Sequence, residues 1–254
     1  RNHFDAFNDP AKFGLFYHAA LLFRRGDVKT SQQAAAINVS EGVDDWLLLE
    51  QEDIPALELV EKQRVGVALP GQSLDAEKVA AIAGGLDPAA GEVLSDTGQL
   101  WRSWDRRIGW IDTEMTKAAY GFLGEAGRID LKGLSLEVKT DFATIAISSL
   151  TDEPISESDT LLLTAVGRSD NSGAQYDDEH QQQFDFGHAP ILIEPIEAKV
   201  ELATTRSNLK VWVISDRAEA VTPLPRVYED GRLKFEIGPQ PRWNPSTMYY
   251  VIKI

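Results

Sequence analysis

The 254-residue sequence contains no cysteine. Disulfide bonds, thiolate metal sites and a cysteine nucleophile are therefore excluded together. The chain also lacks the run of ~18 apolar residues that a helix needs to span a bilayer. Its longest apolar stretch is interrupted by His18 and ends at Arg24 and Arg25. We therefore do not expect it to cross a membrane.

Positive charge is scarce in the sequence. Lysine and arginine together number 25 against 40 aspartate and glutamate residues, for a formal net charge of -15. A field of this sign repels nucleic acid phosphates and anionic lipids. We predict neither nucleic acid nor a membrane as a partner. The 43% hydrophobic and 26% charged residues are typical of an ordinary globular protein.

Motifs for metal and nucleotide chemistry are also missing. The four histidines show no metal-ligand spacing, and no glycine-rich phosphate loop follows a strand. The Gly-x-Ser-x-Gly elbow of serine hydrolases is absent too. We expect no cofactor. Asp170, Asp177 and Asp178 lie in a polar turn segment and are weak calcium candidates, because such residues also simply form turns.

A helix is predicted near the start of the chain. Asp9 and Pro10 form a favourable helix start, and the cationic pair Arg24 and Arg25 precedes Gly26, a favourable stop. The intervening residues are apolar around most of the helix. We expect such a helix to be covered on most sides.

The region before residue 90 is predicted to mix helices and strands. Residues 34–39 and 65–69 are expected to be strands, whereas 54–63 and 74–84 are expected to be helices. A loop-like stretch at 84–91 marks a soft boundary. We therefore predict two domains: residues 1–90, a helical or α/β segment, and residues 91–254, a β-sandwich domain.

The hydrophobic period changes to two from Gly133. Strands are expected at 134–138, 142–150, 161–166, 191–193, 198–202, 209–214, 233–237 and 248–254. Turn residues separate them, and no helix intervenes. The fold class predicted is mostly β: an antiparallel β-sandwich preceded by a smaller α/β segment.

Half of the tryptophans cluster in residues 96–113, which we expect to form an aromatic junction between the two parts. Exposed indoles beside polar groups can stack on the C–H faces of sugars. The alternative is that these indoles fill the seam between the two parts. The candidate carbohydrate-binding residues are Asp96, Gln99, Trp101, Arg102, Trp104, Trp110 and, in a later strand, Trp212.

Carboxylates could also form the catalytic pair of a glycosidase, which needs two of them flanking a cleft. Asp96, Asp105, Asp112 and Glu114 are the residues from which such a pair would be drawn. Helix capping and surface solvation explain most acidic residues equally well.

Several segments resemble the C-terminal part of large clan-A-like bacterial glycoside hydrolases. They are NDP to RRGDV (8–28), SDTGQL (95–100), IDT (111–113), SSL (148–150), LLLTAVGR (161–168) and IEP (193–195). The first is similar to the last helix and exit of a (β/α)8 barrel, and the others are similar to recurring segments of β-rich tails. Each segment alone is weakly specific, and the resemblance depends on their order.

The resemblance implies a bacterial, polysaccharide-degrading parent enzyme whose catalytic glutamates lie on earlier barrel strands. No catalytic residue is therefore assigned here, and the chain is not expected to act alone. It implies a secreted or periplasmic accessory region that stabilises the barrel and contacts polysaccharide or oligosaccharide. Whether the chain forms a homo-oligomer stays an open alternative. The alternatives are a stand-alone carbohydrate-binding module and an independent glycosidase.

Overall fold

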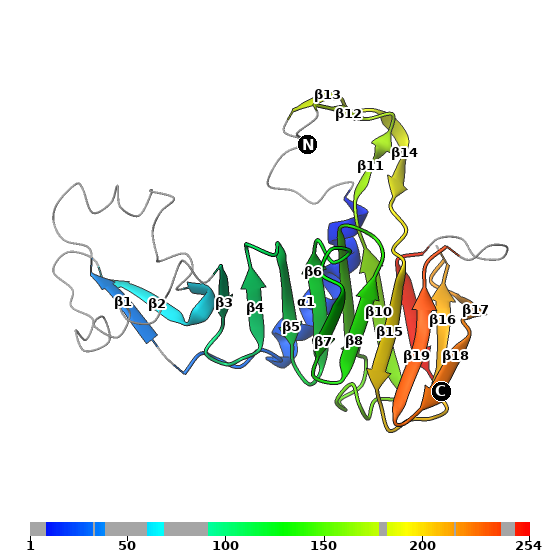
Figure 1. Ribbon diagram of the computed structural model, residues 1–254, viewed down its shortest axis with the longest axis horizontal. Coiled ribbons are helices and arrows are strands. Elements are labelled where there is room, and N and C mark those ends of the chain that lie inside the picture. The colour runs from blue at the N-terminus through cyan, green and yellow to red at the C-terminus, as the bar shows by residue number, and fades with distance from the viewer. Residues whose placement is uncertain are drawn as a thin grey trace. The chain divides into compact units, whose positions relative to one another are not determined.

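The computed structural model describes residues 9–32, 34–38, 60–68, 91–177, 182–215, 217–239 and 247–254. They form a mostly β protein with large antiparallel sheets and one long N-terminal helix (Figure 1). No (β/α)8 barrel is present among these residues. The chain divides into two compact units: the β-rich unit, Arg1–Asp27 and Asp112–Ile254, and the inserted unit, Val28–Ile111.

Helix α1 (Pro10–Arg25) has the bounds that the sequence predicts. The Asp9 side chain accepts a hydrogen bond from the backbone N–H of Lys12 at 3.3 Å, and Gly26 ends the helix in the left-handed conformation. Both ends are fixed by local signals, as the capping rules require. Among the described residues, no helix, α1 included, is long and apolar enough to cross a membrane.

The buried side of α1 is not its aromatic side. Only Gly14 and His18 are buried in the helix. Its large aromatic residues are at least half exposed: Phe13 51%, Phe16 51%, Tyr17 55% and Phe23 86%. The broad cover expected for this helix is therefore not supplied by the described residues on its aromatic side.

The β-rich unit contains two antiparallel sheets (Figure 1). The first runs in the order β17 (Ala220–Pro223), β16 (Lys210–Ile214), β20 (Tyr249–Lys253), β10 (Thr160–Val166), β9 (Ala143–Ser149) and β6 (Thr116–Gly121). The second runs in the order β18 (Arg226–Glu229), β19 (Arg232–Ile237), β15 (Ala198–Ala203), β8 (Leu134–Val138) and β7 (Arg128–Leu131). Except for the one at 191–193, the predicted strands from residue 134 onward lie in these two sheets and are confirmed within small shifts of their ends.

Burial alternates along some strands of each sheet. In β16, Val211 and Val213 are fully buried, whereas Trp212 between them is half-buried. In β15, Val200 and Leu202 are fully buried and alternate with more exposed residues. Each sheet therefore has one face that belongs to a hydrophobic core.

A narrow two-stranded ribbon projects from this unit (Figure 1). Strand β11 (Ser169–Ser172) pairs with β14 (His188–Ile193), and β12 (Gln175–Tyr176) pairs with β13 (Gln183–Asp185) further out. The sequence predicted only the end of β14.

The inserted unit carries a parallel pair, β1 (Ala34–Asn38) and β2 (Arg64–Ala68). It also carries the antiparallel strands β3 (Glu92–Leu94), β4 (Leu100–Ser103) and β5 (Ile108–Asp112). The two strands predicted at 34–39 and 65–69 are confirmed. The helix predicted at 74–84 and most of that predicted at 54–63 lie outside the described residues.

Candidate functional site

Trp101 and Trp110 face each other across β4 and β5. Their ring centroids are 5.9 Å apart, and the planes are inclined by 19°, so the indoles are stacked. The Arg106 guanidinium lies 5.7 Å from the Trp101 ring. Both indoles are half-buried. Their mutual stacking occupies part of the apolar surface that a sugar ring would need.

Trp104 is held by a different arginine in the same unit. The Arg102 guanidinium lies 5.4 Å from the Trp104 ring and forms two hydrogen bonds with the Glu61 carboxylate, at 2.8 and 2.7 Å. This two-point pairing fixes the guanidinium plane above the indole. Trp104 too is half-buried.

Asp96 and Gln99 connect the turn before β4 to the segment that follows α1 in the chain. The Asp96 carboxylate accepts from Ser31 Oγ at 2.7 Å, and the Gln99 side-chain oxygen accepts from the Lys29 backbone N–H at 2.7 Å. These bonds order the inserted unit internally. Six of the seven predicted sugar-binding residues thus belong to this unit.

Trp212 lies in the β-rich unit, on the face of the first sheet that points away from the core. Val251 is its cross-strand neighbour. The row continues through Leu162, Ser148 and Thr116 on the next strands. Trp212 is therefore not brought together with the other predicted tryptophans within one unit.

The calcium candidates have protein partners. Asp170 accepts a short hydrogen bond from the Tyr176 hydroxyl, and the Asp177 carboxylate accepts from the Gln182 backbone N–H at 3.1 Å. Asp178 lies outside the described residues. Among the residues described, no three His, Asp or Glu side chains gather as a metal site would require.

The carboxylates proposed for catalysis fall in both units. Asp96 and Asp105 belong to the inserted unit, whereas Asp112 and Glu114 belong to the β-rich unit. Asp112 forms a short ion pair with Lys117 and accepts from the Lys132 backbone N–H at 2.8 Å. Its two oxygens therefore serve local structure.

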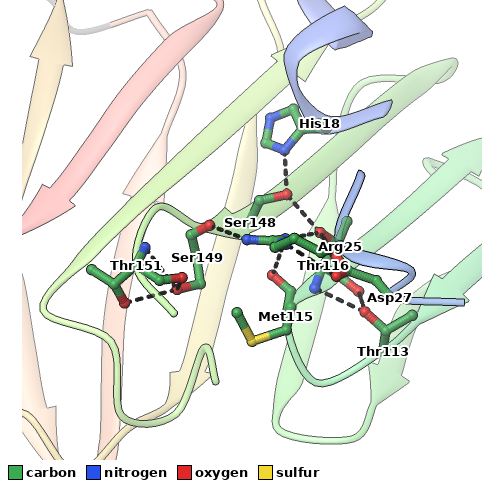
Figure 2. Close-up of polar contacts among 9 residues, drawn as sticks. All are labelled: His18, Arg25, Asp27, Thr113, Met115, Thr116, Ser148, Ser149 and Thr151. Atoms are coloured by element: carbon green, nitrogen blue, oxygen red, sulfur yellow. Dashed lines mark hydrogen bonds and ion pairs between the residues drawn. The ribbon is translucent and has the colours of Figure 1, made fainter. Parts of the chain in front are cut away.

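A buried polar cluster that sequence reasoning missed lies beneath α1 (Figure 2). His18 is 4% exposed, and its Nδ1 and Nε2 lie 2.8 Å from Ser148 Oγ and Thr164 Oγ1. Ser148 Oγ lies 2.9 Å from Thr116 Oγ1, which donates to Asp27 Oδ2 at 2.8 Å. We call these five residues together with Arg25 the helix-pinning network.

The direction of each hydrogen bond in this series follows from Asp27, whose carboxylate can only accept. Thr116 donates its only proton to the Asp27 carboxylate, so Ser148 must donate to Thr116. Ser148 can then only accept from His18, which assigns the ring proton to Nδ1. Thr164 donates to the free Nε2. With a neutral His18 imidazole, each hydroxyl in this series has a hydrogen-bond partner.

Arg25 and Asp27 close the network at the end of α1. Arg25 binds both Asp27 oxygens, at 3.0 and 2.7 Å, and donates to the Ser149 carbonyl at 2.8 Å and to Thr116 Oγ1 at 3.0 Å. The Asp27 side chain is only 1% exposed. Burial first, and then the charge of Arg25, lower the pKa of His18 to about 4.

The network contains serine, histidine and aspartate, but it is not arranged for nucleophilic catalysis. A nucleophilic serine donates its proton to histidine, whereas Ser148 accepts from His18 and donates to Thr116. Ser148 is also fully buried. The arrangement fits a structural role, which is to fix α1 on the first sheet. The sequence signal for this contact was a polar histidine four residues after a glycine in an otherwise apolar helix.

Comparisons with protein-family models, with curated proteins and with solved structures each find no match to this chain.

Proposed function

We propose that this chain is a non-catalytic C-terminal accessory region of a polysaccharide-degrading glycoside hydrolase. In this proposal the α1 side of the β-rich unit packs against the catalytic barrel of the same polypeptide and stabilises it. The observation that carries it is the orientation of α1. Its Gly14 and His18 side is buried, while its four aromatic residues point outward.

The helix cannot readily turn its aromatic side inward. The helix-pinning network holds it through His18 and through Arg25, at two points separated by seven residues. Burying one aromatic side chain contributes roughly 1.5–3 kcal/mol. Because α1 leaves its four aromatic side chains exposed in this chain, they contribute little of this stabilisation here. An exposed apolar patch of this kind is typical of an interaction surface.

The neighbouring sheet surface extends this patch. Leu162, Val251 and Trp212 lie in a cross-strand row on the same face of the first sheet as Ser148, which α1 covers. All three are half-buried. The barrel would therefore meet a helix and an apolar sheet face together.

The finer architecture belongs to the same proposal. We infer that the two sheets of the β-rich unit pack face to face as a β-sandwich, since each has a face with fully buried apolar side chains, such as Val211 in the first sheet and Val200 in the second. Such a sandwich would give α1 a rigid base. The segment around α1 would then be the end of the barrel, as the sequence resemblance implies.

The test is a labelling experiment on the 254-residue chain and on the full reading frame that encodes it. The chain has no native cysteine, so Phe16→Cys and Lys199→Cys each provide one thiol. Phe16 lies on the aromatic side of α1, and Lys199 lies exposed on β15. Phe16→Cys should react with maleimide in the isolated chain and be protected in the full protein. Lys199→Cys should react in both.

Two results would overturn the proposal. One is a full reading frame that contains no barrel or that hydrolyses no polysaccharide. The other is a Phe16→Cys thiol that reacts equally fast in both proteins.

The stacked pair Trp101 and Trp110 favours a second candidate, a stand-alone carbohydrate-binding module. Both indoles keep part of their surface open. This candidate predicts that affinity electrophoresis of the isolated chain in xylan, β-glucan, mannan and galactan shows retardation that Trp101→Ala removes. Retardation that is absent, or unchanged in Trp101→Ala, would exclude this candidate.

A further inference from the structure

A cavity of about 800 Å³ opens in the β-rich unit between the start of α1 and the base of the ribbon. Its volume falls within the range of ~300–1,000 Å³ that is usual for small-molecule sites. None of the predicted sugar-binding residues lines it. Apolar side chains, among them Phe142 and Leu192, form part of its wall, and Arg168, Asp170, Tyr176 and Glu194 supply polar groups.

Close packing holds the base of the ribbon in place. The Glu194 backbone N–H donates to the Arg168 carbonyl at 2.9 Å, and the Arg168 backbone N–H donates to Glu194 Oε2 at 3.3 Å. Gly167 leaves no room for a side chain, because an added Cβ would lie 3.0 Å from the Phe142 carbonyl oxygen. The two polar side chains are therefore carried by ordered backbone.

Hydrogen-bonding capacity is left over at the cavity. The Arg168 guanidinium uses Nη2 to bind Asp141 at 3.2 Å and lies 5.9 Å from the Phe142 ring. Across the described part of the chain, its Nε and Nη1 groups find no hydrogen-bond partner. The same holds there for Glu194 Oε1. A donor group and an acceptor group therefore stand free at one cavity.

Charge at the cavity is mixed. Three acidic residues and two basic ones line it: Asp9, Asp170, Glu194, Lys12 and Arg168. Asp9 already pairs with Lys12 at 3.2 Å. An anionic ligand would meet the carboxylates and the net charge of -15, and a cationic one would meet Arg168 and Lys12. The mixture favours a neutral ligand with several hydroxyl groups.

We propose that this cavity binds a neutral oligosaccharide. Neighbouring sugar hydroxyls would accept from Arg168 and donate to Glu194, while a C–H face would lie on Phe142. The choice of a sugar among neutral polyols rests in part on the proposed function. The cavity lies outside the inserted unit, so its occupancy is independent of Trp101 and Trp110.

The test uses the 254-residue chain and soluble oligosaccharides of neutral xylan, β-glucan, mannan and galactan, with titration calorimetry as the readout. Glu194→Gln keeps the length of the side chain and removes its charge, whereas Arg168→Met keeps an unbranched apolar stem and removes the guanidinium. Each should weaken binding roughly tenfold or more, because hydrogen bonds to charged groups are lost. Arg217→Met, an exposed arginine outside the cavity, is the matched control and should bind as the wild type does.

The inference is overturned if no neutral oligosaccharide binds, if both cavity variants bind as tightly as the wild type, or if oligogalacturonate binds more tightly than every neutral sugar. Circular dichroism of each variant separates loss of binding from loss of folding. Trp101→Ala should leave the affinity unchanged. Loss of affinity in this variant would overturn the inference, because it would assign the sugar to the inserted unit.

Cavity binding in a protein without a barrel would refute only the proposed function. A glycosidase whose cavity variants bind normally would refute only this inference.

Discussion

His18 Nδ1 lies 2.8 Å from Ser148 Oγ, and the two residues are separated by 130 positions in the chain. This one bond joins the N-terminal helix to strand β9 in the middle of the first sheet. The bond is direct and shielded from solvent, since Ser148 is 0% exposed. The position of α1 thus depends on polar groups whose loss would leave others buried and unpaired.

His18→Ala should destabilise the chain by about 2–4 kcal/mol, because the hydroxyls of Ser148 and Thr164 lose their partner and a void forms. Urea unfolding followed by circular dichroism measures the change. His188→Ala removes an exposed histidine and should stay within about 0.5 kcal/mol of the wild type. Equal effects of the two substitutions would contradict the structural role of His18.

Stability should also depend on the protonation of His18. Its pKa falls from 6.5 to about 4 on folding, because burial and then the charge of Arg25 disfavour the imidazolium. Below pH 6.5 the unfolded chain therefore binds more protons than the folded chain, and the free energy of unfolding decreases as the pH falls toward 4. The full contribution, present above this window, is about 3 kcal/mol.

The measurement compares urea unfolding at pH 7 and pH 5 in the wild type and in His18→Gln. Glutamine keeps one donor and one acceptor but does not titrate. The wild type should lose about 2 kcal/mol more than the variant between these pH values. Identical losses would show that His18 does not carry the pH dependence.

Some parts of this fold could be predicted from local sequence and others could not. The bounds of α1 follow from Asp9, Pro10 and Gly26, which act within one helical turn. The burial of His18 depends on Thr164, 146 residues away. The spacing of Gly14 and His18 is a local signal for a buried side of the helix, but it does not indicate which distant residues that side would contact.

Strands, too, could be predicted only where their sequence shows a local pattern. The sequences of β8, β15 and β19 alternate between apolar and polar residues, and these strands were predicted with nearly correct bounds. Strand β6 is buried along nearly its whole length, so its sequence TKAAYG shows no alternation. Strand β11 is polar and half-buried throughout. The stacking of Trp101 on Trp110 needed the register of β4 and β5, which composition does not give.

Arg25→Met should cost about 3–5 kcal/mol, because the Asp27 carboxylate would remain buried without its cation. Asp27→Asn alone should also destabilise, since it removes the partner of Arg25. The double variant should be less destabilised than the sum of the two, because no unpaired charge remains. A double-mutant cycle from thermal unfolding gives the coupling, and strict additivity would argue against the pair.

Phe23→Ser and Phe16→Ser test the outer face of α1. In the isolated 254-residue chain each should change the free energy of unfolding by less than about 1 kcal/mol, because both side chains are at least half exposed. If α1 packs against a barrel as proposed, each should lower the melting temperature of the full polypeptide, because the same side chains would be buried there. Lys199→Ser is the exposed control in both proteins.

Gly14→Leu should lift α1 from the sheet. An added Cβ at Gly14 would already lie 3.1 Å from Val166 Cγ1, so a longer side chain has no space there. The expected loss is about 1–3 kcal/mol, with faster amide hydrogen exchange throughout α1. Ala20→Leu adds the same side chain on the exposed side of the helix and should leave both quantities close to the wild type. If Gly14→Leu exchanged as slowly as Ala20→Leu, α1 would not be seated on the sheet through its glycine and histidine side.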